Sequence, residues 1–235
     1  MIATFINAFT VILGGLIGLL LKKKISSSFK DIVMTAAGVT TLVLGLGMAL
    51  EAPSAIANLF SLILGGFIGF ALKIEDRVLS LGDRIEKLGG KSSSNGDFAK
   101  GFLNSSLLFC TGAMSIVGSI QAGTVSNYEL ILIKSVMDGF MAIVFASTYG
   151  LGVFASAITI IVYQGFFTLA GSYIEPILGE IGISAMASTG GLLLILLALS
   201  LLNLKDSKTG NFLPALILAP IMQYLYSYFH FDFYF

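Results

Sequence analysis

Long hydrophobic runs, separated by short polar connections, make up most of the chain. A helix that crosses the roughly 30 Å of bilayer hydrocarbon needs about 20 apolar residues. Runs near this length predict about eight membrane spans, at residues 2–21, 32–50, 55–72, 102–121, 130–149, 153–174, 183–203 and 212–229. None of them shows the polar–apolar alternation of an outer-membrane barrel strand. The expected fold is therefore all-α, a polytopic transmembrane helix bundle forming one membrane domain over residues 1–235.

The composition supports this interpretation and excludes several other classes. Of the 235 residues, 56% are hydrophobic and 11% are charged, with a mean hydropathy of +0.95. Soluble domains carry about a quarter charged residues, so an ordinary soluble enzyme is excluded. Thirteen basic and thirteen acidic residues cancel, which leaves no basic face for a nucleic acid. The single cysteine, Cys110, excludes a disulfide framework and multi-cysteine metal sites, and we expect no cofactor and no bound metal.

The distribution of lysine and arginine predicts the orientation in the membrane, because these residues concentrate in cytoplasmic loops. With the N-terminus outside, twelve of the thirteen basic residues lie inside. They are Lys22, Lys23, Lys24, Lys30, Lys73, Arg77, Arg84, Lys87, Lys91, Lys100, Lys205 and Lys208. Only Lys134 falls elsewhere, in the span 130–149. That span also carries Asp138, and it is the one expected to be broken or re-entrant.

The segment 73–101 is the only sizeable polar stretch, and it predicts a cytoplasmic amphipathic helix and linker between the third and fourth spans. Its apolar residues recur every three or four positions, which is the helical spacing. They are Ile74, Val78, Leu81, Ile85 and Leu88. Residues 91–96 follow as a flexible linker. The helix is expected to lie on the inner leaflet or against the bundle, and a docking site for a cytosolic partner is the alternative.

Two internal repeats are predicted. Residues 7–22 align without gaps with residues 58–73, and ten of the sixteen positions are identical, including Asn, Phe, three Gly and Lys. This match predicts a parallel duplication of the first and third spans. A weaker relation pairs Gly38 and Asn58 with Gly190 and Asn211, at separations of 20 and 21 residues. Because these spans are expected to run in opposite directions, the relation predicts an inverted-topology repeat, the plan of many secondary transporters.

Small and amide residues in the duplicated spans are candidates for packing. Gly14 with Gly18, and Gly65 with Gly69, form small-residue faces that let helix backbones approach closely. They are expected to pack within the chain, with a homodimer interface as the alternative. Three asparagines, each near the start of a span, are expected to act as helix caps or to line a polar cavity. They are Asn7, Asn58 and Asn211.

Lys134 and Asp138 are the strongest candidates for a binding site. They lie four residues apart and so share one helical face. Charges inside a span are costly and usually face the bundle interior or water. One interpretation is a salt bridge near the outer interface, with Lys134 extending to water. The other makes Asp138 an ion or proton site with Lys134 as its partner.

Further polar and small residues in the spans are candidates for lining the same site. They are Gly112, Ser115, Gln121, Tyr163, Gln164 and Gly190. Glycines can break a helix, and the exposed ends of half-helices offer bare amides or carbonyls to a ligand. Close packing is the alternative for the glycines, and a hydrogen bond to the helix itself is the alternative for the hydroxyls.

No arrangement of residues typical of catalysis is present in the sequence. Cys110 and His230 are single copies at different expected depths, no Gly-x-Ser-x-Gly motif occurs, and Asp138 has no second aspartate inside the membrane. We therefore expect the chain not to be an enzyme.

Several segments together resemble a family of bacterial integral membrane proteins of unknown function, the YqgA/YdfK-like family. They are Asn7–Gly18, Gly112–Gln121, Lys134–Gly139, Tyr163–Gly165, Gly190–Gly191 and Asn211–Ala215. The resemblance covers nearly the whole chain and implies an inner-membrane location. Members of this family often carry an acidic residue where this chain has Ala122, so no role is carried over to that position.

These observations predict a secondary transporter or permease for a small polar or ionic solute, acting as a homodimer in the lipid bilayer of the bacterial inner membrane. A passive channel is the first alternative, because it would need only a continuous polar pore. A membrane scaffold or sensor that signals through residues 73–101 is the second.

Overall fold

The computed structural model describes residues 1–22, 27–88, 97–111, 113–205 and 207–229, and this part of the chain contains helices and no strand. In chain order the elements are α1 (Ile2–Lys22), α2 (Ser27–Leu50), α3 (Ala55–Leu72), α4 (Ile74–Leu88), α5 (Asp97–Thr111), α6 (Ala113–Thr124), α7 (Glu129–Tyr149), α8 (Gly152–Leu201), η1 (Thr209–Phe212) and α9 (Pro214–Tyr228). The expectation of an all-α helical membrane bundle is confirmed.

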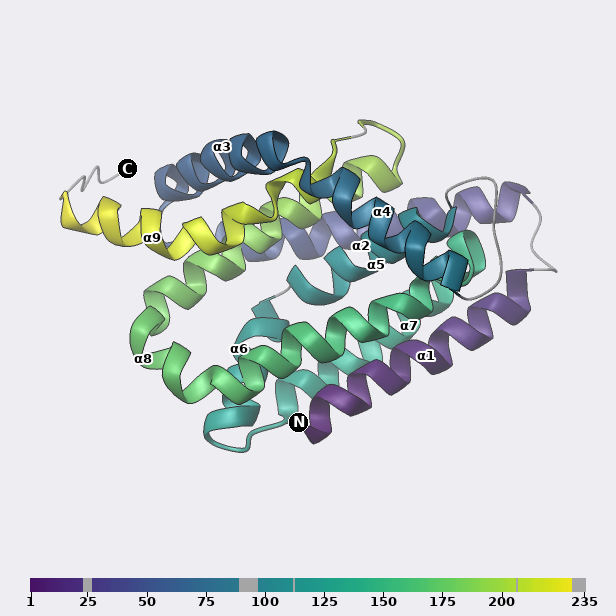
Figure 1. Ribbon diagram of the computed structural model, residues 1–235, viewed down its shortest axis with the longest axis horizontal. Coiled ribbons are helices and arrows are strands. Elements are labelled where there is room, and N and C mark those ends of the chain that lie inside the picture. Colours follow the sequence, from purple (N-terminus) through teal and green to yellow (C-terminus); the bar gives the residue numbers. More distant parts are fainter. Residues whose placement is uncertain (23–26, 89–96, 112, 206, 230–235) are drawn as a thin grey trace.

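The helices run back and forth between two ends of the molecule (Figure 1). The last turns of α1, α4 and α7, the first turns of α2, α5 and α8, and the connection α8–η1 lie at one end, on the right in Figure 1. The connections α2–α3 and α6–α7 and the bend of α8 lie toward the other. The first end is named here the basic end, because Lys22 ends α1, Lys100 lies in the first turn of α5, and Lys205 and Lys208 lie between α8 and η1. The second end is named here the acidic end, because its described residues include exposed glutamates and no exposed lysine or arginine. The glutamates are Glu51, Glu129, Glu175 and Glu180.

Helix α8 is two helical segments joined by a bend. Its 50 residues would extend about 75 Å at 1.5 Å per residue, more than twice the hydrocarbon thickness. The helix is broken at Gly179, whose φ of 56° lies in the left-handed region that favours glycine. Pro176 precedes the break, and the hydroxyl of Tyr224 in α9 donates a hydrogen bond to the carbonyl oxygen of Leu178. The two predicted spans of this region are therefore continuous around one bend.

The break expected in the span 130–149 lies in a different helix. Helix α7 is unbroken over Glu129–Tyr149, because its two charges neutralise each other inside the bundle. Helices α5 and α6 are instead bent by 58° relative to each other where the span 102–121 was expected. Helix α5 also begins at Asp97, five residues earlier than predicted.

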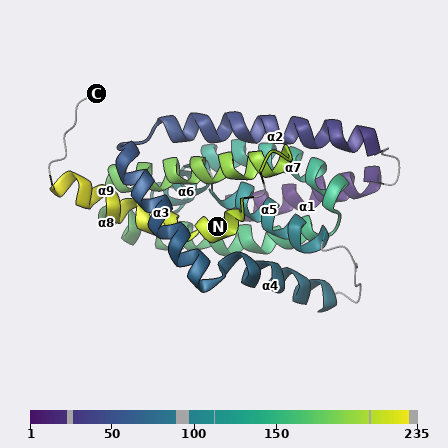
Figure 2. The same cartoon turned by 90° about the horizontal axis from the view of Figure 1, so that it is seen from above.

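In the part of the chain that the structure describes, four helices are long and apolar enough to cross a membrane, namely α1, α3, α7 and α8, and the bent pair α5–α6 adds a fifth. The apolar part of α2, Met34–Leu50, is shorter than a standard span. Helix α9 has 15 residues and starts after the short helix η1. The count of eight spans thus stays a prediction. Figure 2 shows α2 running along the long helices, with α3 crossing them obliquely.

The small-residue faces pack inside the chain. A Cβ added at Gly14 or Gly18 would overlap the carbonyl oxygen of Gly139 or Ile143, both in α7. A Cβ at Gly65 or Gly69 would overlap the backbone of residues 211–215, where η1 leads into α9. Helices α1 and α3 therefore each press their glycine face against the backbone of another segment, at a distance that a larger side chain would prevent.

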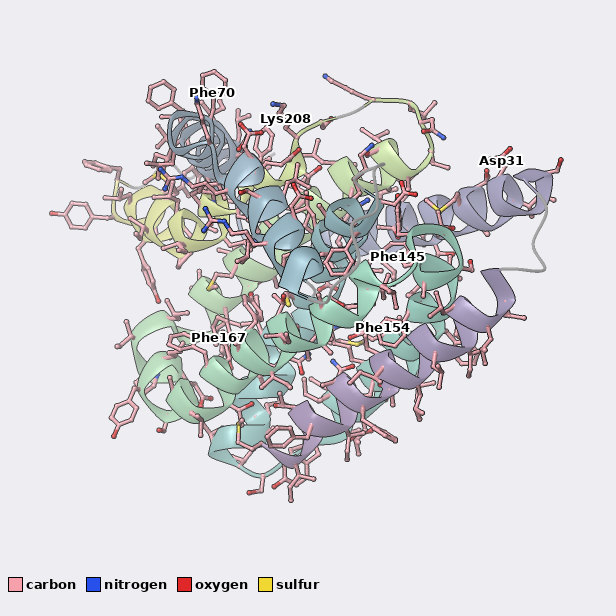
Figure 3. All side chains as sticks on the ribbon, turned by 45° about the vertical axis from the view of Figure 1, so that its right-hand side comes forward. Asp31, Phe70, Phe145, Phe154, Phe167 and Lys208 are labelled. Atoms are coloured by element: carbon pink, nitrogen blue, oxygen red, sulfur yellow. The ribbon has the colours of Figure 1, made fainter. Side chains whose placement is uncertain are left out.

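The outer surface of the bundle is strongly apolar. On α3, for example, Phe67 and Phe70 are 71% and 73% exposed, and Phe70 projects away from the other helices, whereas Phe145 lies among them (Figure 3). Contiguous exposed apolar surface of this extent is typical of a chain that contacts lipid.

Candidate functional site

A buried ion pair lies in α7. The Lys134 ammonium donates to both oxygens of the Asp138 carboxylate, at 2.7 and 2.5 Å. Each residue is 5% exposed. The spacing of four residues on one helical face accounts for the pairing, and the burial differs from the interfacial salt bridge considered from the sequence. Removing such a pair from water is costly unless each charge is well hydrogen-bonded.

Asn7 supplies a further hydrogen bond to the pair from α1. Its Nδ2 donates to Asp138 Oδ2 at 3.0 Å, and the residue is completely buried. Asn7 lies two turns before Gly14 on the same helical face, so the close approach of α1 to α7 at Gly14 and Gly18 brings this amide to the carboxylate. Its carbonyl oxygen, Oδ1, has no hydrogen-bond partner. Asn7 therefore joins two helices and does not cap one.

A second polar network holds the break between α5 and α6. Gly112 lies outside the described residues. The Ser115 hydroxyl donates to the carbonyl oxygen of Phe109 across the break, at 3.0 Å. Gln164 Nε2 of α8 in turn donates to Ser115 Oγ at 3.0 Å, while its Oε1 has no partner. The Lys134 ammonium lies 6.0 Å from the centre of the Phe109 ring, so the break lies directly beside the ion pair.

The remaining candidate residues, Tyr163, Gln121 and Gly190, take part in neither of these two networks. The Tyr163 ring packs against Phe167 with centroids 5.0 Å apart, and its buried hydroxyl has no partner. Gln121 is half-buried near the end of α6, where its backbone oxygen accepts hydrogen bonds from the turn that follows. Gly190 is buried in α8 one turn before Leu194, and Leu194 lines a cavity beside the ion pair.

That cavity has a volume of about 340 Å³ and reaches from Lys134 and Asp138 to Glu51 at the acidic end of α2. Methionines supply much of its wall: Met48, Met114, Met137 and Met141. Sequence reasoning missed Glu51 and the methionines. Met137 and Met141 lie three and seven residues after Lys134, so the helical spacing in α7 was an available signal. Nothing local in α2 indicates that Glu51 and Met48 face α7.

Asn58, which aligns with Asn7 in the sequence, joins α3 to α8. Its Nδ2 donates to Ser188 Oγ at 3.0 Å, and its Oδ1 accepts from the Thr189 hydroxyl at 3.2 Å. The capping role considered from the sequence is wrong for Asn58, because Ser54 is the N-cap of α3 and accepts from the Ala57 amide. Asn58 makes its contacts with neutral hydroxyls only.

Asn211 caps a helix, but not the one that follows it. Its Oδ1 accepts a hydrogen bond from the backbone amide of Glu75, in the first turn of α4, at 3.0 Å. Glu75 Oε2 returns the contact by accepting from the Gly210 amide at 2.9 Å. These two hydrogen bonds connect the first turn of the amphipathic helix α4 to η1. The linker expected at residues 91–96 lies outside the described residues.

A bundle of apolar helices with a lipid-exposed surface and a buried ion pair defines the class: the chain is an integral membrane protein. It belongs to the family described as "Protein of unknown function (DUF554)", whose model matches residues 2–224, as the resemblance implied. It is 31% identical to the uncharacterized membrane protein YdfK of Bacillus subtilis (strain 168), over 96% of both chains. It is 27% identical to the uncharacterized protein YqgA of Escherichia coli (strain K12), over 93% of this chain and 94% of that one. No solved structure matches it significantly.

Proposed function

We propose that the chain is a secondary transporter or permease for a small polar or ionic solute and that the solute binds at Lys134 and Asp138. The observation that carries the proposal is a buried ion pair at the base of a cavity that reaches one end of the bundle. Ionisable residues inside a membrane are retained at a cost and mark substrate or ion pathways. The pair is assigned to binding and to movement of a coupling proton, not to catalysis.

The helix arrangement supports alternating access to this site. Helix α2 packs antiparallel to the second half of α8, where a Cβ at Gly45 would lie 2.7 Å from the carbonyl oxygen of Gly191. Helix α3 packs antiparallel to α9, where Gly65 meets Ala215 and Gly69 meets Asn211. We propose that α2–α3 and α8–α9 form the inverted repeat, and that their movement relative to α5–α7 opens the cavity to either side.

We further propose the bacterial inner membrane as the location, with the basic end in the cytoplasm and the N-terminus outside. Cysteine labelling tests this orientation in a Cys110→Ser background. Val125 and Leu204 are each 70% exposed and lie at the acidic and basic ends. A membrane-impermeant maleimide added to intact cells should label Val125→Cys and spare Leu204→Cys. The reverse pattern would contradict the orientation.

A homodimer is also proposed, on a surface other than the glycine faces, because those faces are occupied within the chain. The apolar exposed side of α3 is large enough to contact a second copy or lipid. Mass measurement of the protein in detergent and in lipid nanodiscs tests the proposal. A mass equal to two chains is expected in both, and a monomer in both would contradict it.

The first experiment is a thermal-shift screen of the purified protein against amino acids, polyamines, organic acids and inorganic ions. A ligand that binds the native state raises its apparent stability. A hit that is lost in Asp138→Asn would support the site. The paired variant Lys134→Gln/Asp138→Asn, which leaves no lone buried charge, keeps the test valid if the single variant folds poorly. Counterflow of the hit in proteoliposomes then separates a transporter, which shows it, from a channel. No shift with any compound would favour the scaffold alternative.

A further inference from the structure

The cavity beside the ion pair carries a net negative charge. Among its lining residues Glu51 and Asp138 are acidic and Lys134 is basic. Asp138 already holds Lys134 through two hydrogen bonds, so the uncompensated charge is that of Glu51, which is exposed at the entrance. The surrounding acidic end adds Glu129, Glu175 and Glu180, all exposed. A cleft lined by one sign of charge raises the local concentration of ions of the opposite sign.

The wall of the cavity is apolar and adaptable. Four of the eight methionines of the chain line it, from three different helices. Methionine side chains are unbranched and polarisable, and they adjust to ligands of irregular shape. Val43, Leu44 and Leu194 complete the apolar wall. This surface suits a ligand with an apolar body and does not suit a bare hydrated ion.

Asn7 and Phe109 contact the ion pair from behind and do not line the cavity. The Asn7 amide that donates to Asp138 leaves its own carbonyl oxygen without a partner, in a residue that is completely buried. A buried acceptor without a partner is costly and is relieved by a donor. The Phe109 ring, 6.0 Å from the Lys134 ammonium, already faces a cation. Within the cavity itself, an ammonium group would meet the carboxylates of Asp138 and Glu51.

We propose that the cavity binds a small organic cation, namely an ammonium group with N–H donors carried on an apolar body, with the ammonium between Glu51 and Asp138 and the body against the methionines. This inference rests on the site of the proposed transport function and names its substrate class. A carboxylate ligand would face two acidic side chains, and its only cationic partner, Lys134, is already bound to Asp138.

The test uses the full-length protein in detergent and ligands that share one apolar body but differ in charge. Isothermal titration would compare phenethylammonium, phenylalanine, 3-phenylpropanoate and 2-phenylethanol. Phenethylammonium should bind more tightly than the other three by at least about tenfold. Benzyltrimethylammonium, which has no N–H group, should bind more weakly than phenethylammonium. Tighter binding of the zwitterion or of the anion would overturn the inference, as would no binding by phenethylammonium.

Two carboxylates at the same end of the molecule provide a matched pair of variants. Glu51 lines the cavity, whereas Glu129, which is also exposed, does not. Glu51→Gln should weaken phenethylammonium binding about fivefold, the effect of a partly exposed charge pair, and Glu129→Gln should leave it unchanged. Both substitutions are at exposed positions, so folding should not be affected. Equal loss in the two variants, or no loss in Glu51→Gln, would overturn the placement of the ligand.

The same preparations distinguish failure of this inference from failure of the transport proposal. Binding of phenethylammonium with the expected variant pattern, but no uptake or counterflow in proteoliposomes, would support the cation site and contradict transport. Uptake of an anion or a sugar, without phenethylammonium binding, would support transport and overturn the cation inference.

Discussion

Helices α1 and α3 contain similar segments, residues 7–22 and 58–73, which are identical at ten of sixteen positions, but the two helices meet very different partners. In both, the glycine pair packs against the backbone of another part of the chain. The asparagine that begins each segment then faces another helix. Asn7 faces the charged pair of α7 and keeps an unpartnered oxygen, whereas Asn58 faces Ser188 and Thr189 with both ends of its amide paired.

The two similar segments therefore share the packing of their glycines but differ in the contacts of their asparagines. In each case the glycine face brings the helix close to its neighbour. The side chains of that neighbour then decide whether the asparagine amide has all its hydrogen-bond partners, as in Asn58, or contacts a charged pair, as in Asn7. On this basis the α3 contact is structural, and the α1 contact belongs to the proposed binding site. The predictions below test the comparison from the largest expected effect to the smallest.

Removing one member of the ion pair should have the largest effect. Asp138→Leu leaves the Lys134 charge buried without a partner, and the expected loss of unfolding free energy is about 3–5 kcal/mol. Ser188→Ala, the comparable change beside Asn58, should cost about 1 kcal/mol, because Thr189 still donates to Asn58. Denaturation by SDS in mixed micelles would measure both. Equal losses would contradict the distinction between a charged and a neutral contact.

Filling the glycine faces should affect both copies alike. Gly18→Ala and Gly69→Ala each place a methyl group against a backbone carbonyl that cannot move alone, with an expected loss of about 1–3 kcal/mol. Gly47→Ala is the control, because a Cβ at Gly47 meets nothing within 4 Å. The melting temperature in detergent should fall for the first two and hold or rise for the third. A loss confined to one copy would show that the two faces are not equivalent.

The two asparagines should differ in what their removal affects. Asn58→Ala removes hydrogen bonds within a neutral contact, so stability should fall by about 1–2 kcal/mol with ligand binding unchanged. Asn7→Ala removes the donor that holds the Asp138 carboxylate at the cavity, so phenethylammonium binding should weaken about tenfold. Titration calorimetry and denaturation on the same samples would separate these effects. Weaker binding in Asn58→Ala would place the site nearer to α3.

The smallest effects concern the connection that follows α3. Asn211→Ala removes the cap of α4 and should cost about 1 kcal/mol. Lys208→Gln breaks an exposed ion pair with Asp76, whose atoms are 3.7 Å apart, and should change stability by less than about 0.5 kcal/mol. Hydrogen exchange of the α4 amides would report local loosening in the first variant only. Protection unchanged in Asn211→Ala would exclude the capping role.

The sequence by itself predicted the class of the protein, the positions of most helices and the pairing of Lys134 with Asp138. These features depend on local patterns: run length, the distribution of basic residues and the spacing of four residues along one helix. It also predicted that Gly14, Gly18, Gly65 and Gly69 would pack, since small residues in apolar helices permit close approach.

The tertiary structure alone decided which partner each of these residues has. It placed the helix break between α5 and α6 instead of in α7, and it joined the two halves of α8 around Gly179. It brought Asn7 to Asp138, Asn58 to Ser188 and Asn211 to Glu75, across separations of 130 residues or more. It also placed Glu51 and Met48 over the ion pair. Hydrophobic periodicity specifies that a face is buried but not against which helix, and the chemistry of a site depends on that choice.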